Sequence, residues 1–230
     1  MLIGGLQKIS LIDYPDKICS VIFTIGCNFK CKFCYNPELV LINSQQPTIK
    51  QEDIFKFLKK KKKFIDGVCV TGGEPTLHQD LPEFLEQIKK MGFLVKLDTN
   101  GTNPKMLKKL IKKKLVDYIA MDIKAPFLKY EKIIGKKIDL SKIKESIKII
   151  INFPDYEFRT TVAPNLVTEE DIIFIAKQIK GAKKYFLQQF VPSEKMIDEK
   201  YKKLKPYPME ILKKMRDKTK KYIKTVKIRM

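Results

Sequence analysis

Residues 18–34 of the chain read ICSVIFTIGCNFKCKFC. The first seven residues, Ile18–Thr24, form a short run rich in apolar and β-branched side chains, which predicts a buried strand. Three cysteines, at positions 27, 31 and 34, follow in a loop directly after that strand. Reactive side chains just beyond a strand end are expected at the rim of a parallel β-structure, where such folds build their sites.

The same pattern continues along the chain as strands that alternate with helices. Strands are also predicted at Val68–Thr71, Leu94–Asp98, Tyr118–Ile123, Glu157–Val162 and Tyr185–Phe190. Helices are predicted near Lys50–Lys62, Leu81–Met91, Pro104–Lys114, Ser141–Ile151, Thr168–Ile179 and Pro208–Tyr222, with Pro104 in a first turn and Ser141 and Thr168 as N-caps. This alternation indicates an α/β fold with a parallel sheet.

Polar or glycine-rich residues follow every predicted strand, which favours a barrel over an open sheet. We therefore expect a partial (βα)6 TIM-type barrel whose side is open, because six units cannot close it. The expected organisation is one domain over residues 1–230, with a core at about 17–192 and a C-terminal helical extension at about 193–230.

Composition excludes several classes of protein. Hydrophobic residues make up 44% and charged residues 32% of the chain, as in soluble globular proteins. No apolar run reaches the roughly 18 residues of a membrane span, and the N-terminus does not read as a signal peptide. We expect a cytoplasmic protein without a membrane partner.

The formal net charge is +21, from 47 basic and 26 acidic residues. Only Arg159, Arg216 and Arg229 are arginines, whereas sites that read nucleic acid favour arginine. We therefore expect no nucleic-acid partner. A compositional bias of the genome and attraction to an acidic protein partner both remain open as reasons for the charge.

Five cysteines without a predicted signal peptide argue against a disulfide framework. Cys19 and Cys69 each lie alone inside a predicted strand, where a buried, unreactive thiol is the ordinary interpretation. Cys27, Cys31 and Cys34 remain as metal ligands. Structural zinc and simple ferredoxin clusters use four protein ligands, so three thiolates leave one position open for a substrate.

The stretch from Cys27 to Cys34 resembles the CxxxCxΦC motif of radical S-adenosylmethionine (SAM) enzymes, with Phe33 as the aromatic residue beside the cofactor. Gly72-Gly73-Glu74 resembles the GGE motif of the same family. The resemblance implies a [4Fe-4S] cluster on the three cysteines. It also implies that the amino and carboxylate groups of SAM bind the fourth iron.

The resemblance extends along nearly the whole chain to the activating proteins of anaerobic ribonucleoside-triphosphate reductase, which are relatives of the pyruvate formate-lyase activating enzyme. Two positions depart from that pattern: Tyr35 stands where many such sequences have His, and Asp16 where Gly is common. The matching segments are Gly5–Pro15, Val21–Cys27, Cys34–Leu39, Met121–Pro126, Lys129-Tyr130, Arg159–Val162 and Leu187–Phe190.

This family resemblance implies a specific chemistry. An electron from the reduced cluster cleaves SAM to methionine and a 5′-deoxyadenosyl radical, which takes a hydrogen from a glycine Cα of a partner glycyl-radical enzyme. A flavodoxin- or ferredoxin-type protein would supply the electron. The alternatives are another glycyl-radical enzyme as partner, a small molecule such as a deazapurine precursor or a tRNA as substrate, and a non-enzymatic iron–sulfur or zinc module.

Matching the motifs position by position gives the remaining site residues. Gly72, Gly73 and Glu74 would bind the SAM amino group. Asp98, Asp122 and Lys124, at later strand ends, would face the SAM carboxylate and ribose. Asp98, Thr99 and Asp122 would surround a monovalent cation. Arg159 would clamp a carboxylate or the substrate, and it is predicted as a catalytic residue together with Lys124. Asp13 would touch the glycine loop of the partner, and His78 is expected to have no catalytic role. For each of these polar residues a cap, turn or rim ion pair is the ordinary alternative.

Overall fold

The structure is a computed structural model that describes residues 1–41 and 46–230. Its strands form a mostly parallel eight-stranded sheet in which they follow one another in chain order, and β1 pairs antiparallel with β2. The strands are β1 (Ile3–Ser10), β2 (Cys19–Thr24), β3 (Gly67–Gly72), β4 (Leu94–Thr99), β5 (Tyr118–Asp122), β6 (Tyr156–Val162), β7 (Lys184–Gln189) and β8 (Thr225–Arg229).

The chain divides into two compact units. Unit 1 consists of Met1–Asn28 and Glu38–Ile119, and unit 2 of Phe29–Pro37 and Ala120–Met230. The boundary therefore falls inside the cysteine motif, between Asn28 and Phe29, and again within β5.

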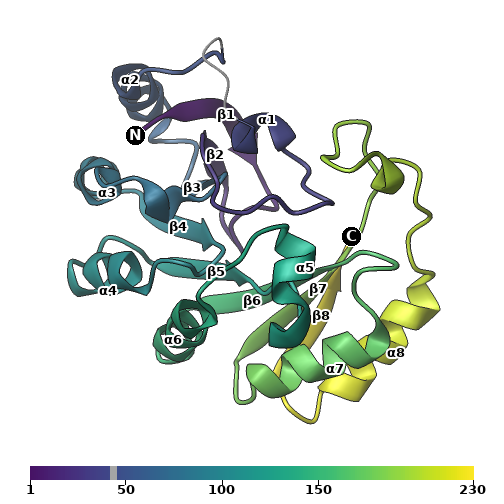
Figure 1. Ribbon diagram of the computed structural model, residues 1–230. Helices are drawn as coiled ribbons and strands as arrows, with labels where there is room; N and C mark the ends of the chain where they lie inside the picture. Colours follow the sequence, from purple (N-terminus) through teal and green to yellow (C-terminus); the bar gives the residue numbers. More distant parts are fainter. Residues whose placement is uncertain (42–45) are drawn as a thin grey trace. The chain divides into compact units, whose positions relative to one another are not determined.

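In unit 1, helices α2, α3 and α4 lie along one side of strands β2 to β4 (Figure 1). In the parallel register of these strands Val21 pairs with Cys69, and Cys69 pairs with Lys96. The helices of this part of the chain are α1 (Pro37–Val40), α2 (Gln51–Lys61), α3 (Leu81–Lys90) and α4 (Pro104–Lys112), with a 3-10 turn, η1, at Pro75–Leu77.

In unit 2, helices α7 and α8 lie side by side, and α8 packs on β7 and β8 (Figure 1). The parallel ladder continues from β6 through β7 to β8. The helices of unit 2 are α5 (Tyr130–Ile134), α6 (Leu140–Ile151), α7 (Glu169–Gln178) and α8 (Met209–Thr219), with 3-10 turns η2 at Phe127–Lys129 and η3 at Glu199–Tyr201.

Local capping sets where the helices begin. Thr168 caps α7 in a capping box with Asp171, as predicted. Pro104 occupies the first turn of α4, and Asn103 caps that helix by accepting a hydrogen bond from the Met106 N–H. The prediction of Ser141 as an N-cap is wrong, because Asp139 accepts the Ser141 N–H and α6 begins at Leu140.

All six predicted strands and all six predicted helices are present, with ends that differ by at most a few residues. Strands β1 and β8 and helices α1 and α5 were not predicted. Strand β1 contains Gly4 and Gly5, which have low strand propensity, and β8 contains Lys227, a residue type that is also depleted in strands. The (βα)6 alternation is thus extended by one strand at each end of the sheet.

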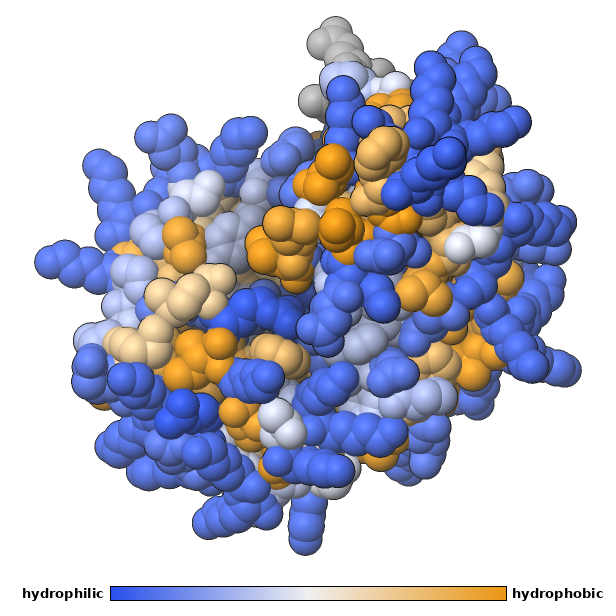
Figure 2. Space-filling model, turned by 180° about the vertical axis from the view of Figure 1, so that it is seen from behind, coloured by the Kyte–Doolittle hydropathy of each residue, from blue (hydrophilic) through white to orange (hydrophobic). Residues whose placement is uncertain are grey.

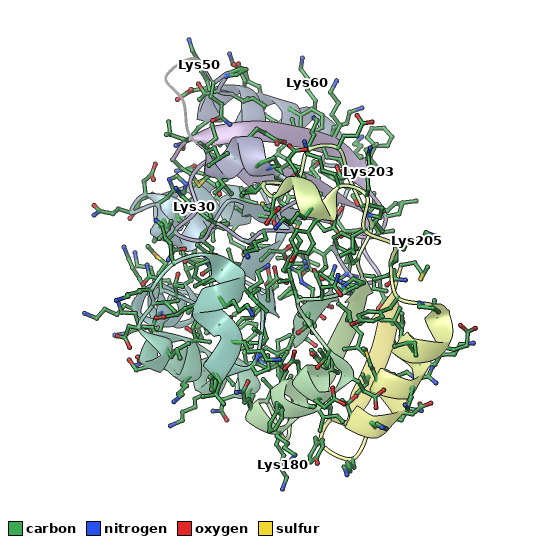
Figure 3. The ribbon with its side chains drawn as sticks, turned by 45° about the vertical axis from the view of Figure 1, so that its right-hand side comes forward. Lys30, Lys50, Lys60, Lys180, Lys203 and Lys205 are labelled. Carbon is green, nitrogen blue, oxygen red and sulfur yellow. The ribbon has the colours of Figure 1, made fainter. Side chains whose placement is uncertain are left out.

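Lysine side chains dominate the surface. Hydrophilic residues cover most of the face shown in Figure 2, with smaller hydrophobic areas between them. Lys50, Lys60 and Lys180 are exposed and point away from the ribbon (Figure 3). Among the described residues, no helix is both long enough and apolar enough to cross a bilayer.

Candidate active site

The boundary between the two units falls within the cysteine motif. Cys27 belongs to unit 1 and lies just beyond β2, whereas Cys31, Phe33 and Cys34 belong to unit 2. A turn in which the Cys34 N–H donates to the Cys31 carbonyl, at 3.0 Å, shapes the second half of the motif. All five cysteines are free thiols, and Cys19, Cys31 and Cys69 are buried.

The loop before Cys27 is fixed by the glycine pair after β3. The Gly73 N–H donates to the Thr24 carbonyl at 2.8 Å, and the Glu74 N–H donates to the Gly26 carbonyl at 2.7 Å. A Cβ on Gly73 would stand 2.0 Å from the Gly26 oxygen, so only glycine allows this approach. The pair therefore has a role in holding the cysteine loop, beyond the ordinary tight turn that two glycines often indicate.

Glu74 links the loops after β3 and β4. Its carboxylate accepts hydrogen bonds from the Thr76 hydroxyl at 2.5 Å, the Thr99 hydroxyl at 2.8 Å and the Asn100 N–H at 2.6 Å. Burial raises the pKa of Glu74, and these hydrogen bonds oppose that shift. The structure thus brings Glu74 and Thr99, two of the predicted site residues, into direct contact.

Asparagines that the sequence analysis did not select complete this arrangement in unit 1. Asn100 donates from its side-chain amide to the Asn28 Oδ1 at 2.8 Å, and Asn28 donates to the Thr102 hydroxyl at 2.9 Å. Asn28 stands inside the cysteine motif and Asn100 inside the loop after β4. Their pairing joins partners 72 residues apart, so no local sequence pattern could have revealed it.

Asp98, at the end of β4, forms an ion pair with Lys96. The Lys96 side chain is 2% exposed and that of Asp98 is 10% exposed. The Lys96 ammonium also lies 3.7 Å from the Cys69 sulfur. Lys96 was not among the predicted site residues, although a lysine in the middle of a buried strand is unusual enough to draw attention.

Asp122, Lys124 and Arg159 form the polar group of unit 2. Asp122 accepts from the Lys124 ammonium and from the Arg159 Nε, each at 2.9 Å. Burial would raise the pKa of Asp122, but Arg159 and Lys124 hold it well below its usual range. Burial would likewise lower the pKa of Lys124, but Asp122 and Cys31 raise it, so both groups are charged at neutral pH.

The same lysine acts on Cys31. Burial raises the pKa of the Cys31 thiol to about 11, and the positive charge of Lys124 opposes this shift. Tyr130 accepts the Lys124 N–H at 3.3 Å and packs edge-on against Phe29. A cationic neighbour favours thiolate over thiol and therefore favours metal binding at Cys31.

Asp13, a predicted contact of the partner, and His78, which is expected to have no catalytic role, lie in other surroundings. Asp13 accepts a hydrogen bond from the Ser10 hydroxyl at 2.6 Å, in the turn between β1 and β2. His78 follows η1, and burial lowers its pKa.

The donor set fits an iron–sulfur cluster. Free thiols, one of them beside Lys124, can supply thiolates to iron. Within the described ranges, no three His, Cys, Asp or Glu side chains gather as a metal site. The motif and its family, rather than an assembled ligand cage, therefore carry the cluster assignment.

Comparisons with known proteins agree with this interpretation. Residues 21–179 match the model of the radical SAM superfamily. The chain is 42% identical to MJ1227 of Methanocaldococcus jannaschii, whose name assigns it to the glycyl-radical enzyme activating enzymes, over 99% of this chain and 95% of that protein. It is 27% identical to the pyruvate formate-lyase-activating enzyme of Streptococcus mutans, over 91% of this chain and 84% of that enzyme.

The chain therefore belongs to the radical SAM superfamily. Within that superfamily it is a glycyl-radical-enzyme activating enzyme. Streptococcus suis SuiB, solved with SAM bound, shares the fold with a TM-score of 0.70 at 16% identity, over 91% of this chain and 50% of SuiB. This likeness and the mostly parallel sheet confirm the predicted partial TIM-type barrel of a radical SAM core.

Proposed function

We propose that this enzyme activates an anaerobic ribonucleoside-triphosphate reductase by generating a glycyl radical on it. The observation that carries the proposal is the set of matching segments, from Gly5–Pro15 to Leu187–Phe190, in a chain that aligns over 99% of its length with an activating enzyme. A different glycyl-radical enzyme is the second candidate, because a pyruvate formate-lyase-activating enzyme also aligns over most of the chain.

The proposed cofactor site uses Cys27, Cys31 and Cys34 to hold a [4Fe-4S] cluster, with Phe33 beside it. When bound, the cluster and SAM supply one-electron reductive cleavage that yields a carbon radical. Gly72, Gly73 and Glu74 would hold the SAM amino group. Since the Glu74 carboxylate already accepts bonds from Thr76, Thr99 and Asn100, its proposed part is to shape the loop and orient its backbone.

The charged group of unit 2 is proposed to position the rest of SAM. Lys124 and Arg159 offer positive charge for a carboxylate, and Asp122 keeps both side chains oriented through two 2.9 Å contacts. Asp98 and Thr99 are proposed to face the ribose. These residues are proposed to bind and orient SAM, and no proton transfer is required of them.

The remaining parts of the proposal concern partners. Asp13 is proposed to contact the glycine loop of the reductase. A flavodoxin- or ferredoxin-type protein is proposed as electron donor. A cytoplasmic location stays a prediction.

The test combines the two proteins. Incubation of the reconstituted enzyme and the reductase with SAM and a reductant under argon should give a doublet in the EPR spectrum. The doublet should collapse to a singlet when the reductase carries α-deuterated glycine, because its splitting comes from the Cα hydrogen. Cys31→Ala enzyme is the matched control and should give no signal.

The alternatives are further arms of this experiment. A radical formed on a pyruvate formate-lyase and none on the reductase would move the assignment to another glycyl-radical enzyme. Turnover of a deazapurine precursor or a tRNA without any protein radical would overturn the assignment of the partner.

A further inference from the structure

Lys96 is a buried cation for which the proposed function has no use so far. It lies in the middle of β4, between Val95 and Leu97, whose side chains are fully buried. Lysine is almost never fully buried unless it is paired, because removing an ammonium from water costs several kcal/mol. The Lys96 ammonium therefore requires a specific ion-pair partner.

The alternation of side chains along a strand supplies the partner. Residues 96 and 98 point to the same face of β4, so the ammonium reaches the Asp98 carboxylate two residues along. The register partner on β3 is Cys69, a small side chain that leaves room for the long lysine and contacts its Nζ at 3.7 Å. Sequence and register together thus build a site for this ion pair.

The Cys19 thiol, which interacts electrostatically with Lys96, does not compete with Asp98 for the ammonium. Burial raises the pKa of Cys19 to about 11, and Asp13 raises it as well, while Lys96 acts in the opposite direction. Cys19 is therefore a neutral thiol at physiological pH. Asp98 supplies the negative charge that balances Lys96, and it keeps part of its side chain accessible, since it is 10% exposed against 2% for the lysine.

We propose that Lys96 is a positioning residue that neutralises and orients Asp98, so that SAM binding needs no dissolved monovalent cation at this carboxylate. The inference rests on the proposed role of Asp98 toward SAM. The ammonium contacts the Oδ1 atom of the carboxylate, and 10% of the Asp98 side chain stays exposed. At Asp98, the fixed charge takes the place of the cation that the sequence predicts around Asp98, Thr99 and Asp122.

The first experiment measures SAM affinity by equilibrium dialysis under argon. Lys96→Met should raise the dissociation constant at least tenfold, and the Lys96→Met/Asp98→Asn double variant should bind no more weakly than Asp98→Asn alone, because the lysine acts through the aspartate. Lys89→Met is the matched control: Lys89 pairs with Asp117 at 2.7 Å in the same unit and should leave the affinity unchanged. The proposal would be overturned if Lys96→Met weakened SAM binding by the same factor in the wild type and in the Asp98→Asn variant.

The second experiment varies the cation. Wild-type SAM affinity should be the same in potassium and in choline chloride. Lys96→Ala should bind SAM more tightly when methylammonium or potassium is added than in choline. Wild-type binding that requires potassium would overturn the inference while leaving the proposed function intact, whereas a wild type that binds no SAM under any condition would contradict the proposed function.

A third measurement does not depend on the cluster or on SAM. The melting temperature of cluster-free Lys96→Ala should rise with methylammonium relative to choline, and that of the wild type and of Lys89→Met should not. If Lys96→Ala does not fold, the Lys96→Met/Asp98→Asn variant, which carries neither charge, still tests the coupling. Equal responses of wild type and Lys96→Ala to methylammonium would exclude a cation-sized site at Asp98.

Discussion

At the scale of single residues, the cysteines divide into two kinds by their position. Cys27, Cys31 and Cys34 follow β2, whereas Cys19 and Cys69 lie within β2 and β3. Cys19 and Cys69 are fully buried. The sequence-based prediction that these two are unreactive core thiols agrees with their burial.

Alanine in place of Cys27, Cys31 or Cys34 should abolish cluster content and SAM cleavage. Anaerobically reconstituted wild type should hold about four irons per chain. Cys19→Ala and Cys69→Ala should keep that iron content, at a cost in stability of about 1–2 kcal/mol from the small cavity left behind. Iron and sulfide analysis checks this. A loss of iron in either core variant would mean that the ligand set is wrong.

Cys19 also predicts a dependence of stability on alkaline pH. Burial raises its pKa from 9.0 to about 11, so the folded state binds the proton more tightly than the unfolded state does. The stabilisation is complete below pH 9 and is lost as the pH rises toward 11, by up to about 3 kcal/mol. Urea unfolding of cluster-free protein at several pH values should show a smaller alkaline loss for Cys19→Ala. Identical pH profiles would contradict the shift.

Asp122 predicts how SAM affinity responds to substitution. Asp122→Ala leaves Lys124 and Arg159 without their shared carboxylate, which should cost about 3–5 kcal/mol of stability. Asp122→Asn, the milder change, should weaken SAM binding and retain iron. Isothermal titration with SAM and iron analysis separate the two effects. Unchanged affinity would assign Asp122 to structure alone.

At the scale of elements, the contacts that shape the site are made by the loops after the strands rather than by the strands themselves. The Gly73 and Glu74 backbone N–H groups donate to Thr24 and Gly26, so the loop after β3 supports the one that carries Cys27. Strand positions could be predicted from the sequence because apolar runs are local. Contacts between loops could not, because Asn28 and Asn100 meet only after the strands are paired.

The unpredicted strands have a similar explanation. Strand β1 pairs antiparallel with β2 and has three exposed residues in succession, so its sequence lacks a clear alternation. Ser141 was predicted as an N-cap because serine is common there, but Asp139 accepts its N–H instead. Lys96 was not predicted as a site residue, because its contact with Cys69 arises only when β3 and β4 pair.

Gly73→Ala tests the role of the loops. The added Cβ would stand 2.0 Å from the Gly26 oxygen, so the loop before Cys27 must shift. We expect a fall in melting temperature and a lower iron content after reconstitution. Gly5→Ala is the matched control, because its nearest contact would be 3.4 Å from Phe23, an ordinary distance. Normal cluster assembly in Gly73→Ala would show that this contact is dispensable.

At the scale of the whole molecule, the charge of +21 is the dominant property. Exposed lysines include Lys50 and Lys60, at the two ends of α2, and Lys180, which follows α7 (Figure 3). Opposite charges accelerate the encounter of two proteins, and salt screens this effect over a Debye length of about 8–10 Å.

If the reductase is acidic, the rate of radical formation should fall as sodium chloride rises from 50 to roughly 300 mM. These concentrations lie below and above physiological ionic strength, so they lengthen and shorten the distance over which charges act. Single substitutions such as Lys60→Ala should change the rate by less than about twofold, because the charge is distributed. Stopped reactions quantified by EPR give the rates. A rate independent of salt would favour compositional bias as the origin of the lysines.

The ion pair between Arg229 and Glu157 has a consequence for how the protein is made. Glu157 is fully buried in β6, and Arg229, in β8, reaches both of its carboxylate oxygens, at 2.8 and 3.1 Å, while lying over the Phe186 ring. A ribosome adds Glu157 72 residues before it adds this arginine. Glu157 can therefore form this ion pair only after translation has reached residue 229, and a nascent chain halted earlier should remain a substrate for chaperones and proteases.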